Sequence, residues 1–204
     1  VFPKSDAVLA LTAGVQDGEE LLKLIFKHIP NAFNQNSIPT SHIQFEDALK
    51  QKLTNFRILP EARISESITS QKVNGNIYHI ETNSEQVKSI QLDFNQKTVE
   101  FWQTDHRGKH LVIAGLNKWI EGRTSITGNK LHHQYQSDNM RIVAHGYWWD
   151  ANTFEMIWQF NETAWQDRIR IHFTENLISL DRWTNANYAP RVQPTLRGKL
   201  IKQT

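Results

Sequence analysis

The sequence predicts a mainly β protein (α+β overall), in which an antiparallel β-barrel or half-barrel of about 8–10 strands follows one strand and one or two helices. Two observations predict this class. From about residue 66 onwards, apolar and polar residues alternate with a period of two, and turn residues recur every 8–12 positions. Before residue 66, the apolar residues form one short continuous run and then follow a helical period.

The composition indicates a globular chain and excludes several classes of protein. The 204 residues include 23 Lys and Arg against 21 Asp and Glu, and 39% of them are hydrophobic. A net charge of +2 is too small to indicate nucleic-acid binding. The longest apolar run is far shorter than the ~20 residues that a membrane-spanning helix needs. The absence of cysteine excludes disulfides, Cys-zinc sites and thiol nucleophiles, and it leaves the cellular compartment open.

Residues 1–35 are predicted to be the terminal strand and helix of a larger domain. The apolar run over residues 6–13 predicts a buried strand. Asp17 and Glu20 have the spacing of a capping box, which predicts a helix over about 17–33. One strand and one helix cannot enclose a core, so a sheet from elsewhere is expected to complete this part. The apolar stripe of the helix consists of Leu21, Leu22, Ile25, Phe26 and Ile29.

Residues 36–65 are predicted to be a connector, and residues 66–204 the β domain. Pro39 and Pro60 punctuate the connector, and a weak helical pattern lies between them. In the β domain, Asn74-Gly75 is the strongest hairpin signal. The predicted strands are 66–73, 76–82, 87–94, 97–103, 109–116, 119–126, 131–136, 139–149, 152–160, 166–174, 177–183 and 195–202.

No motif in the chain predicts a catalytic centre or a cofactor. The sequence contains no Ser-x-x-Lys, Lys-Thr-Gly, Tyr-x-Asn or Gly-x-Ser-x-Gly, and it has neither of the glycine-rich loops that bind nucleotides. His132 and His133 are adjacent, so on a strand they point to opposite faces, and His106 and His110 flank a turn. No metal site is therefore predicted. Three carboxylates on different strands are interpreted as solvent-exposed: Glu155, Asp167 and Asp181.

The aromatic residues leave two interpretations open. Seven Trp in 204 residues is a high number, and most of them are expected to pack in the core. One or two could instead form a stacking platform for a sugar or another flat ligand, with a few polar side chains around it. The candidate ligand-binding residues are Trp102, Trp119, Arg141, His145, Tyr147, Trp148, Trp158, Arg182 and Trp183.

Two parts of the chain resemble a known family. Pro3, Asp6, Thr12 and Gly14, with the Leu-Leu-x-x-Ile helix that ends at residues 30–33, resemble the end of a β-lactamase-related serine hydrolase domain of the class C and penicillin-binding type. Residues 66–204 resemble the lipocalin-like β-rich extension that follows that domain in many bacterial hydrolases. The matching stretches are residues 145–154, 160–163, 185 and 196–199.

The resemblance implies that the chain is a C-terminal fragment whose catalytic serine, lysine and tyrosine have no counterpart here. The expected partner is then the catalytic domain of the same parent chain, and an unpaired strand at residues 6–13 could also form a homodimer. The first functional hypothesis is a non-catalytic accessory domain that packs on the hydrolase. The alternative is a barrel that binds a small molecule or a cell-wall fragment. A third hypothesis is an enzyme site assembled from His145, Tyr147, Asp181 and Arg182, and strand parity already puts Asp181 and Arg182 on opposite faces.

Overall fold

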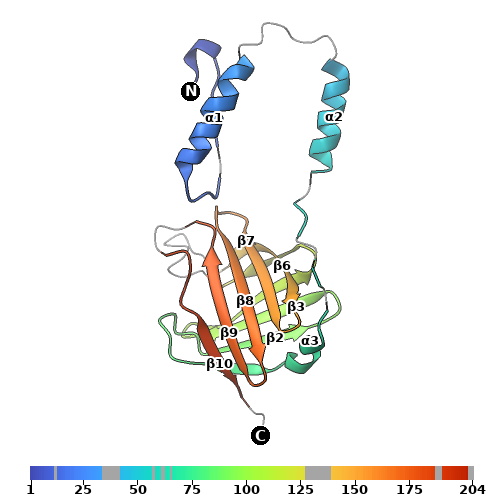
Figure 1. Cartoon of the computed structure of the whole chain (residues 1–204), viewed down its shortest axis with the longest axis vertical. Coiled ribbons are helices and arrows are strands. Elements are labelled where there is room, and N and C mark those ends of the chain that lie inside the picture. The colour runs from blue at the N-terminus through green and yellow to red at the C-terminus, as the bar shows by residue number, and fades with distance from the viewer. Residues whose placement is uncertain are drawn as a thin grey trace. The chain divides into compact units, whose positions relative to one another are not determined.

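A computed structural model describes residues 1–11, 13–33, 42–56, 58–60, 63–64, 66–126, 139–186 and 190–201. The chain divides into two compact units, residues 1–59 and 60–204 (Figure 1). The first unit is helical, and the second contains all ten strands of the described residues.

The first unit holds the 3-10 turn η1 (Pro3–Ser5) and the helices α1 (Gly18–Phe33) and α2 (His42–Thr54). The Asp17 carboxylate accepts a hydrogen bond from the backbone N–H of Glu19 at 2.9 Å, so Asp17 caps α1 as predicted. The helix predicted over about 17–33 is therefore confirmed, and α2 lies within the predicted connector, where the weak helical pattern falls. None of the helices in the described residues is long and apolar enough to cross a membrane.

The strand predicted over residues 6–13 is wrong for the residues described there. Phe2 and Ala7 form one isolated bridge, and no extended strand follows. Val8 is 77% exposed and Leu11 is 50% exposed. An extended segment needs a neighbouring strand for its N–H and C=O groups, and no described strand pairs with this one. The homodimer through this segment stays a prediction, without a formed strand to support it.

The second unit consists of a short helix and ten strands. The helix is α3 (Ile68–Val73). The strands are β1 (Ile77–Ile80), β2 (Ser89–Phe94), β3 (Thr98–Asp105), β4 (Gly108–Leu116), β5 (Ile120–Thr124), β6 (Met140–Asp150), β7 (Thr153–Phe160), β8 (Gln166–Thr174), β9 (Leu177–Thr184) and β10 (Leu196–Leu200).

The strands form a closed barrel in the described part of the chain. Their order is β4-β3-β2-β1-β10-β9-β8-β7-β6-β5, and β4 also pairs with β6, which closes nine strands into a ring and leaves β5 as an extra strand along β6. All neighbours are antiparallel except at the closure, where Gly115 pairs with His145 and Leu116 with Gly146 in parallel. In Figure 1, β7, β8 and β9 form one wall, and β2 and β3 run behind it. The predicted antiparallel barrel is confirmed.

One predicted strand is a helix, and another lies outside the described residues. Residues 68–73 form α3, because Ser67 caps the segment through a hydrogen bond from the Thr69 N–H, and Thr69 and Val73 are buried on one face of the turn. The predicted Asn74-Gly75 hairpin is therefore wrong: Gly75, at φ +73°, joins α3 to β1. The strand predicted at 131–136 lies outside the described residues, as do His132 and His133.

The interior of the barrel is filled by large side chains. Inward-facing positions alternate with outward-facing ones along the strands, as the burial of every second residue of β3 shows. The largest interior side chains are all less than 2% exposed: Trp148, Trp158, Tyr78, Phe101, Phe154 and Phe160. The barrel is thus a packed core. Buried charged side chains also occur at inward-facing positions, as Asp167 and Arg182 show.

The turn between β4 and β5 depends on a close backbone approach at Gly115. The chain closes the barrel at Gly115 and Leu116 and then reverses to run antiparallel to β6. A Cβ added to Gly115 would lie 2.3 Å from the carbonyl oxygen of Lys118. We expect Gly115→Ala to lower the free energy of unfolding by about 1–3 kcal/mol in a urea titration, because the backbone must move.

Gly122 on β5 provides the matched control. A Cβ there would meet only the Ile142 side chain, at 3.9 Å, in ordinary van der Waals contact. Gly122→Ala should therefore leave stability unchanged or raise it slightly, because alanine reduces the freedom of the unfolded chain. Equal losses in the two variants would contradict this account of the closure.

Candidate functional site

The structure separates the sequence-predicted site residues into two groups. Trp148, Trp158 and Arg182 point into the barrel and are buried. Five of the other candidates occupy outward-facing strand positions: Trp102, Arg141, His145, Tyr147 and Trp183. The sixth, Trp119, lies in the turn before β5. Asp181 and Arg182 do lie on opposite faces, because Asp181 is half-buried on the outside and Arg182 is buried inside.

The inward-facing candidates serve the barrel's own packing. Trp158 lies edge-on to Phe101 at 5.3 Å between ring centroids, and Trp148 stacks on Phe94 at 5.5 Å. The Arg182 guanidinium donates a hydrogen bond to the Glu85 carboxylate, with which it forms a buried ion pair. These three side chains are therefore already engaged with neighbours in the barrel.

Polar and aromatic side chains gather on the outer wall formed by β6, β7, β8 and β9. We call this set the outer-wall cluster. Strand register brings its members together: Tyr147 is opposite Glu155, Glu155 is opposite Arg170, and Arg168 is opposite Trp183. The cluster consists of Arg63, Tyr147, Trp149, Glu155, Arg168, Arg170 and Trp183.

The centre of the cluster is the Glu155 carboxylate, which is 0% exposed. Its Oε1 accepts a hydrogen bond from the Tyr147 hydroxyl at 2.5 Å and one from Arg168 Nη1 at 2.9 Å. Its Oε2 lies 2.6 Å from both Nε and Nη2 of Arg170. A buried carboxylate is costly unless it is paired and hydrogen-bonded, and this one is bound by two guanidinium groups. The prediction that Glu155 is exposed to solvent is thus wrong. The same prediction for Asp167 is also wrong, because Asp167 is 1% exposed.

Indole rings flank the arginines that Glu155 holds. The Arg170 guanidinium lies 4.4 Å from the ring centroid of Trp149 and 5.4 Å from that of Trp183. Arg168 lies 5.6 Å from Trp183. Trp149 is 38% exposed, and the side chains of Arg168 and Arg170 are 27% and 32% exposed. Charged and aromatic surface therefore reaches solvent side by side, in positions that the buried carboxylate fixes.

A short segment before the barrel adds a third guanidinium. Ile64 forms an isolated bridge with Trp148, whose backbone N–H donates to the Ile64 carbonyl at 2.9 Å. The Asn117 side chain donates to the Arg63 carbonyl at 3.0 Å. These contacts hold Arg63 with its guanidinium 4.3 Å from the Trp149 ring centroid. The cluster therefore contains three guanidinium groups and one carboxylate, Glu155, so its net charge is positive.

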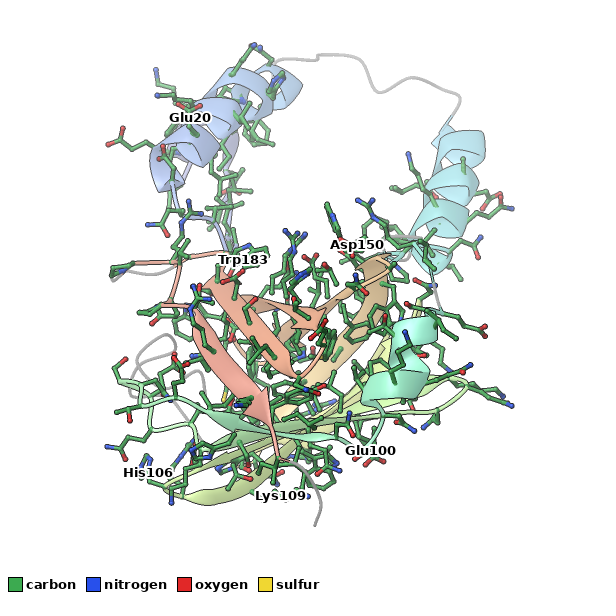
Figure 2. All side chains as sticks on the ribbon, turned by 60° about the horizontal axis from the view of Figure 1, so that its bottom comes forward. Glu20, Glu100, His106, Lys109, Asp150 and Trp183 are labelled. Carbon is green, nitrogen blue, oxygen red and sulfur yellow. The ribbon has the colours of Figure 1, made fainter. Side chains whose placement is uncertain are left out.

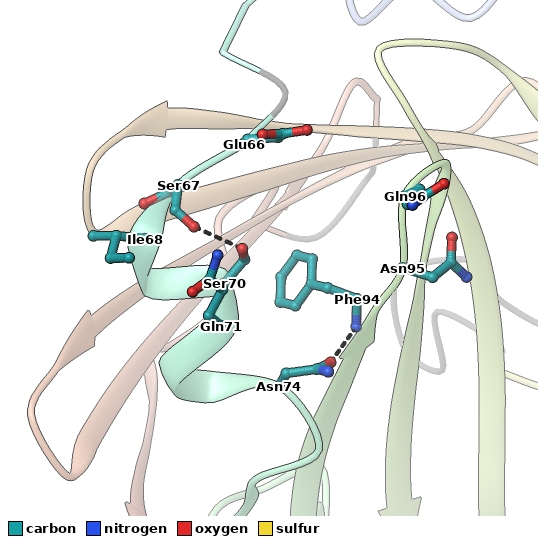
Figure 3. Close-up of a pocket in the computed structure, with 9 residues that line it drawn as sticks. All are labelled: Glu66, Ser67, Ile68, Ser70, Gln71, Asn74, Phe94, Asn95 and Gln96. Carbon is teal, nitrogen blue, oxygen red and sulfur yellow. Dashed lines mark hydrogen bonds between the residues drawn. The ribbon is translucent and has the colours of Figure 1, made fainter.

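Two open hollows lie elsewhere on the unit. One, of ≈ 490 Å³, lies between α3 and the β2–β3 turn, and Figure 3 shows its mixed polar lining around the Phe94 ring. There the Asn74 side chain accepts a hydrogen bond from the Phe94 N–H at 2.6 Å. The other, of ≈ 520 Å³, is bordered by Arg141, Glu121 and Arg123. The second hollow brings Arg123 and Arg141 together, but neither hollow has a buried carboxylate among its lining residues to fix its polar groups, so the outer-wall cluster is the better-built site.

A second buried charge lies at the end of the barrel where β3 turns into β4. Asp105 accepts hydrogen bonds from the Arg107 N–H at 2.7 Å and from Arg107 Nη2 at 2.7 Å, and its Oδ1 lies 3.0 Å from His110 Nε2. Burial alone would raise the pKa of Asp105, but the bonds from Arg107 and His110 outweigh it and lower that pKa to about 2. In the described residues, no group of three His, Asp or Glu side chains could hold a metal ion.

The sequence alone identified only part of the cluster. Tyr147 and Trp183 were candidates because of their residue types, whereas Arg63, Trp149, Glu155, Arg168 and Arg170 were not. The available signal was strand parity, which places Arg168, Arg170 and Trp183 on the polar face of consecutive strands. Pairing of β7 with β8, which brings Glu155 to both arginines, could not be read from one sequence.

No family model matches this chain, and no curated protein matches it. Among solved structures, the fatty-acid-binding protein isolated from Manduca sexta is similar, with a TM-score of 0.37 and 7% sequence identity. The match covers 63% of this chain and 98% of that chain. The hydrolase part of the sequence resemblance has no counterpart in these results and stays a prediction.

We expect Glu155→Gln to lower the free energy of unfolding by about 2 kcal/mol, because two arginines lose their buried counter-charge. Urea unfolding monitored by circular dichroism measures the loss. The control is Glu162→Gln, since Glu162 and its partner Arg141 are 63% and 50% exposed and 3.9 Å apart, so this variant should match the wild type. Similar stabilities for all three proteins would show that Glu155 does not organise the outer wall.

Asp105→Asn should lower the free energy of unfolding by about 2 kcal/mol at neutral pH, and by progressively less as the pH falls. A carboxyl whose folded pKa is lowered from 3.8 to about 2 stabilises the fold above its unfolded pKa, and that stabilisation is lost as the pH falls from about 4 towards 2. Unfolding free energies of both proteins at pH 6 and at pH 2.5 test this. A stability difference that is the same at the two pH values would be the contrary result.

Proposed function

We propose that the barrel is a binding module whose outer-wall cluster recognises a small anionic molecule that contains a ring, of the kind found in carboxylated sugars of cell-wall fragments. The observation that carries this proposal is the pair Arg168 and Arg170. Both are held by one fully buried carboxylate and yet remain about one third exposed beside the rings of Trp149 and Trp183.

The arginine side chains favour the anionic group of such a ligand, and the tryptophan side chains favour its ring. Guanidinium groups bind carboxylates through directed, charge-assisted hydrogen bonds, and a net positive surface attracts an anion. The part of the Trp149 ring that the guanidiniums of Arg63 and Arg170 leave exposed, together with the half-buried Trp183, can pack against the apolar face of a flat ring. Because Glu155 already fixes both arginines, binding would require little further ordering of side chains.

The interior offers a less favourable place for such a ligand. Its large side chains pack against one another, and Trp148 contacts the rings of Phe94, Phe154 and Phe173. A guest there would have to displace packed aromatic rings, at a cost of several kcal/mol. The outer wall needs no such rearrangement.

The test is a titration of tryptophan fluorescence with two sugars that differ in one group. N-acetylmuramic acid carries a carboxylate that N-acetylglucosamine lacks. We expect N-acetylmuramic acid to bind at least tenfold more tightly, and Trp149→Ala and Trp183→Ala each to weaken its binding at least tenfold, since both remove the surface on which the ring packs.

Trp102→Ala is the control. Trp102 also faces outward and also lies beside a cation, Lys109 at 4.2 Å, but it belongs to β3. Trp183 and Lys109 lie on opposite walls of this unit (Figure 2). The control variant should bind like the wild type. Equal binding of both sugars, or an unchanged affinity in the Trp149 and Trp183 variants, would contradict the proposal.

The second candidate is the accessory role that the sequence resemblance implies. The first unit favours it, because α1 exposes large apolar side chains: Leu22 is 49% exposed, Leu24 55% and Phe26 64%. Exposed apolar residues in this number are typical of a surface that another protein body covers. In this role the first unit would contact a catalytic domain, and the outer-wall cluster could still bind a ligand.

A further inference from the structure

A serine, a histidine and an aspartate form a continuous hydrogen-bonded chain at the end of the barrel where β3 meets β4. His110 Nε2 lies 3.0 Å from Asp105 Oδ1, and His110 Nδ1 lies 2.7 Å from Ser125 Oγ. The three residues come from β3, β4 and the segment after β5, so they span 20 positions in the sequence and match no catalytic motif.

Strand parity and turn geometry bring the three side chains together. Asp105 is the last inward-facing residue of β3, and His110 is the first inward-facing residue of β4. The strands pair directly, with Asp105 opposite Gly108. Ser125 follows β5, where the Thr124 hydroxyl accepts a hydrogen bond from the Ile126 N–H at 3.0 Å and fixes the turn. β4 and β5 are not neighbours in the sheet, so the Ser125–His110 contact joins them.

The ionisation state of Asp105 determines which ring nitrogen of His110 carries the proton. Arg107 donates to both Asp105 oxygens, from its N–H at 2.7 Å and from its Nη2 at 2.7 Å, and these bonds keep the carboxylate ionised. An ionised carboxylate only accepts hydrogen bonds, so His110 Nε2 must carry the proton. In the neutral form of the ring, Nδ1 then holds a lone pair that can accept a hydrogen bond from the Ser125 hydroxyl. This is the arrangement of a nucleophile, a general base and an orienting acid.

Exposure differs along the chain of hydrogen bonds in the way that a reactive serine requires. His110 is 6% exposed and Asp105 4% exposed, so water competes little for their bond. Ser125 is half-buried and so is more exposed than its two partners. None of these residues belongs to the outer-wall cluster, and the two sites can be tested separately.

We propose that Ser125 is a nucleophile activated by His110, able to react with small activated acyl or phosphonyl electrophiles. With a fluorophosphonate, Ser125 Oγ forms a bond to phosphorus, the phosphorus–fluorine bond breaks, fluoride leaves and the hydroxyl proton passes to His110 Nδ1. With an activated ester, Oγ attacks the carbonyl carbon, the alkoxide or phenoxide leaves with the proton, and water later hydrolyses the acyl-serine.

Incubation of the full chain with an alkyl fluorophosphonate, followed by intact-mass measurement and peptide mapping, tests the proposal. We expect one adduct, on Ser125. Ser125→Ala should abolish it, and His110→Gln should slow it at least 100-fold, because a general base contributes about that much or more. Ser70→Ala is the control: the Ser70 hydroxyl donates to the Ser67 carbonyl instead of to a base, so its removal should not change the labelling.

The wild-type protein alone can overturn the proposal. If it shows no adduct, or an adduct on a residue other than Ser125, then the Ser125–His110 bond only joins β5 to β4. Unchanged labelling in a folded His110→Gln variant would also contradict activation by His110. Circular dichroism of each variant establishes that it is folded, so that a loss of labelling is not a loss of structure.

Discussion

Because the barrel is closed, the side chain of each strand residue points either into the interior or outwards. The size of the interior side chains then decides what the barrel can hold. The parallel pairing of Gly115 with His145 completes the ring. With Trp148, Trp158 and their aromatic neighbours inside, the interior is a packed core. Glu155 on the outer wall and Asp105 at one end of the barrel are two of the buried charges in the described part of the chain, which also include Asp167 and Arg182 at inward-facing positions.

Much of the fold could be predicted because its signals are local. The period-two alternation located β1 to β10 within a few residues, and Asp17 marked the start of α1. The errors arose where tertiary context outweighs local pattern. The apolar run at residues 6–13 looks like a buried strand but has no partner in the described residues. Residues 68–73 alternate like a strand, yet the Ser67 cap and the burial of Thr69 and Val73 select one helical segment.

The candidate site could be predicted only in part, because it depends on which strands pair. Parity separated Asp181 from Arg182, which the structure places on opposite faces of β9. It could not show that Glu155 lies between Tyr147 on one neighbour and Arg170 on the other. A lone glutamate on a polar strand face is usually solvated, and only the register turns this one into a buried counter-ion. The approach of Ser125 to His110 is likewise a product of closure, since β4 and β5 are not paired.

The central claim is that the outer wall, and not the interior, binds the ligand. The most direct measurement is the set of indole N–H signals in a ¹H–¹⁵N spectrum recorded during titration with N-acetylmuramic acid, since the chain has seven tryptophans in different environments. Our account predicts that the signals of Trp149 and Trp183 shift in a saturable way, while those of the buried Trp148 and Trp158 stay in place. Saturable shifts of Trp148 or Trp158, with Trp149 and Trp183 unchanged, would place the ligand inside the barrel and contradict it.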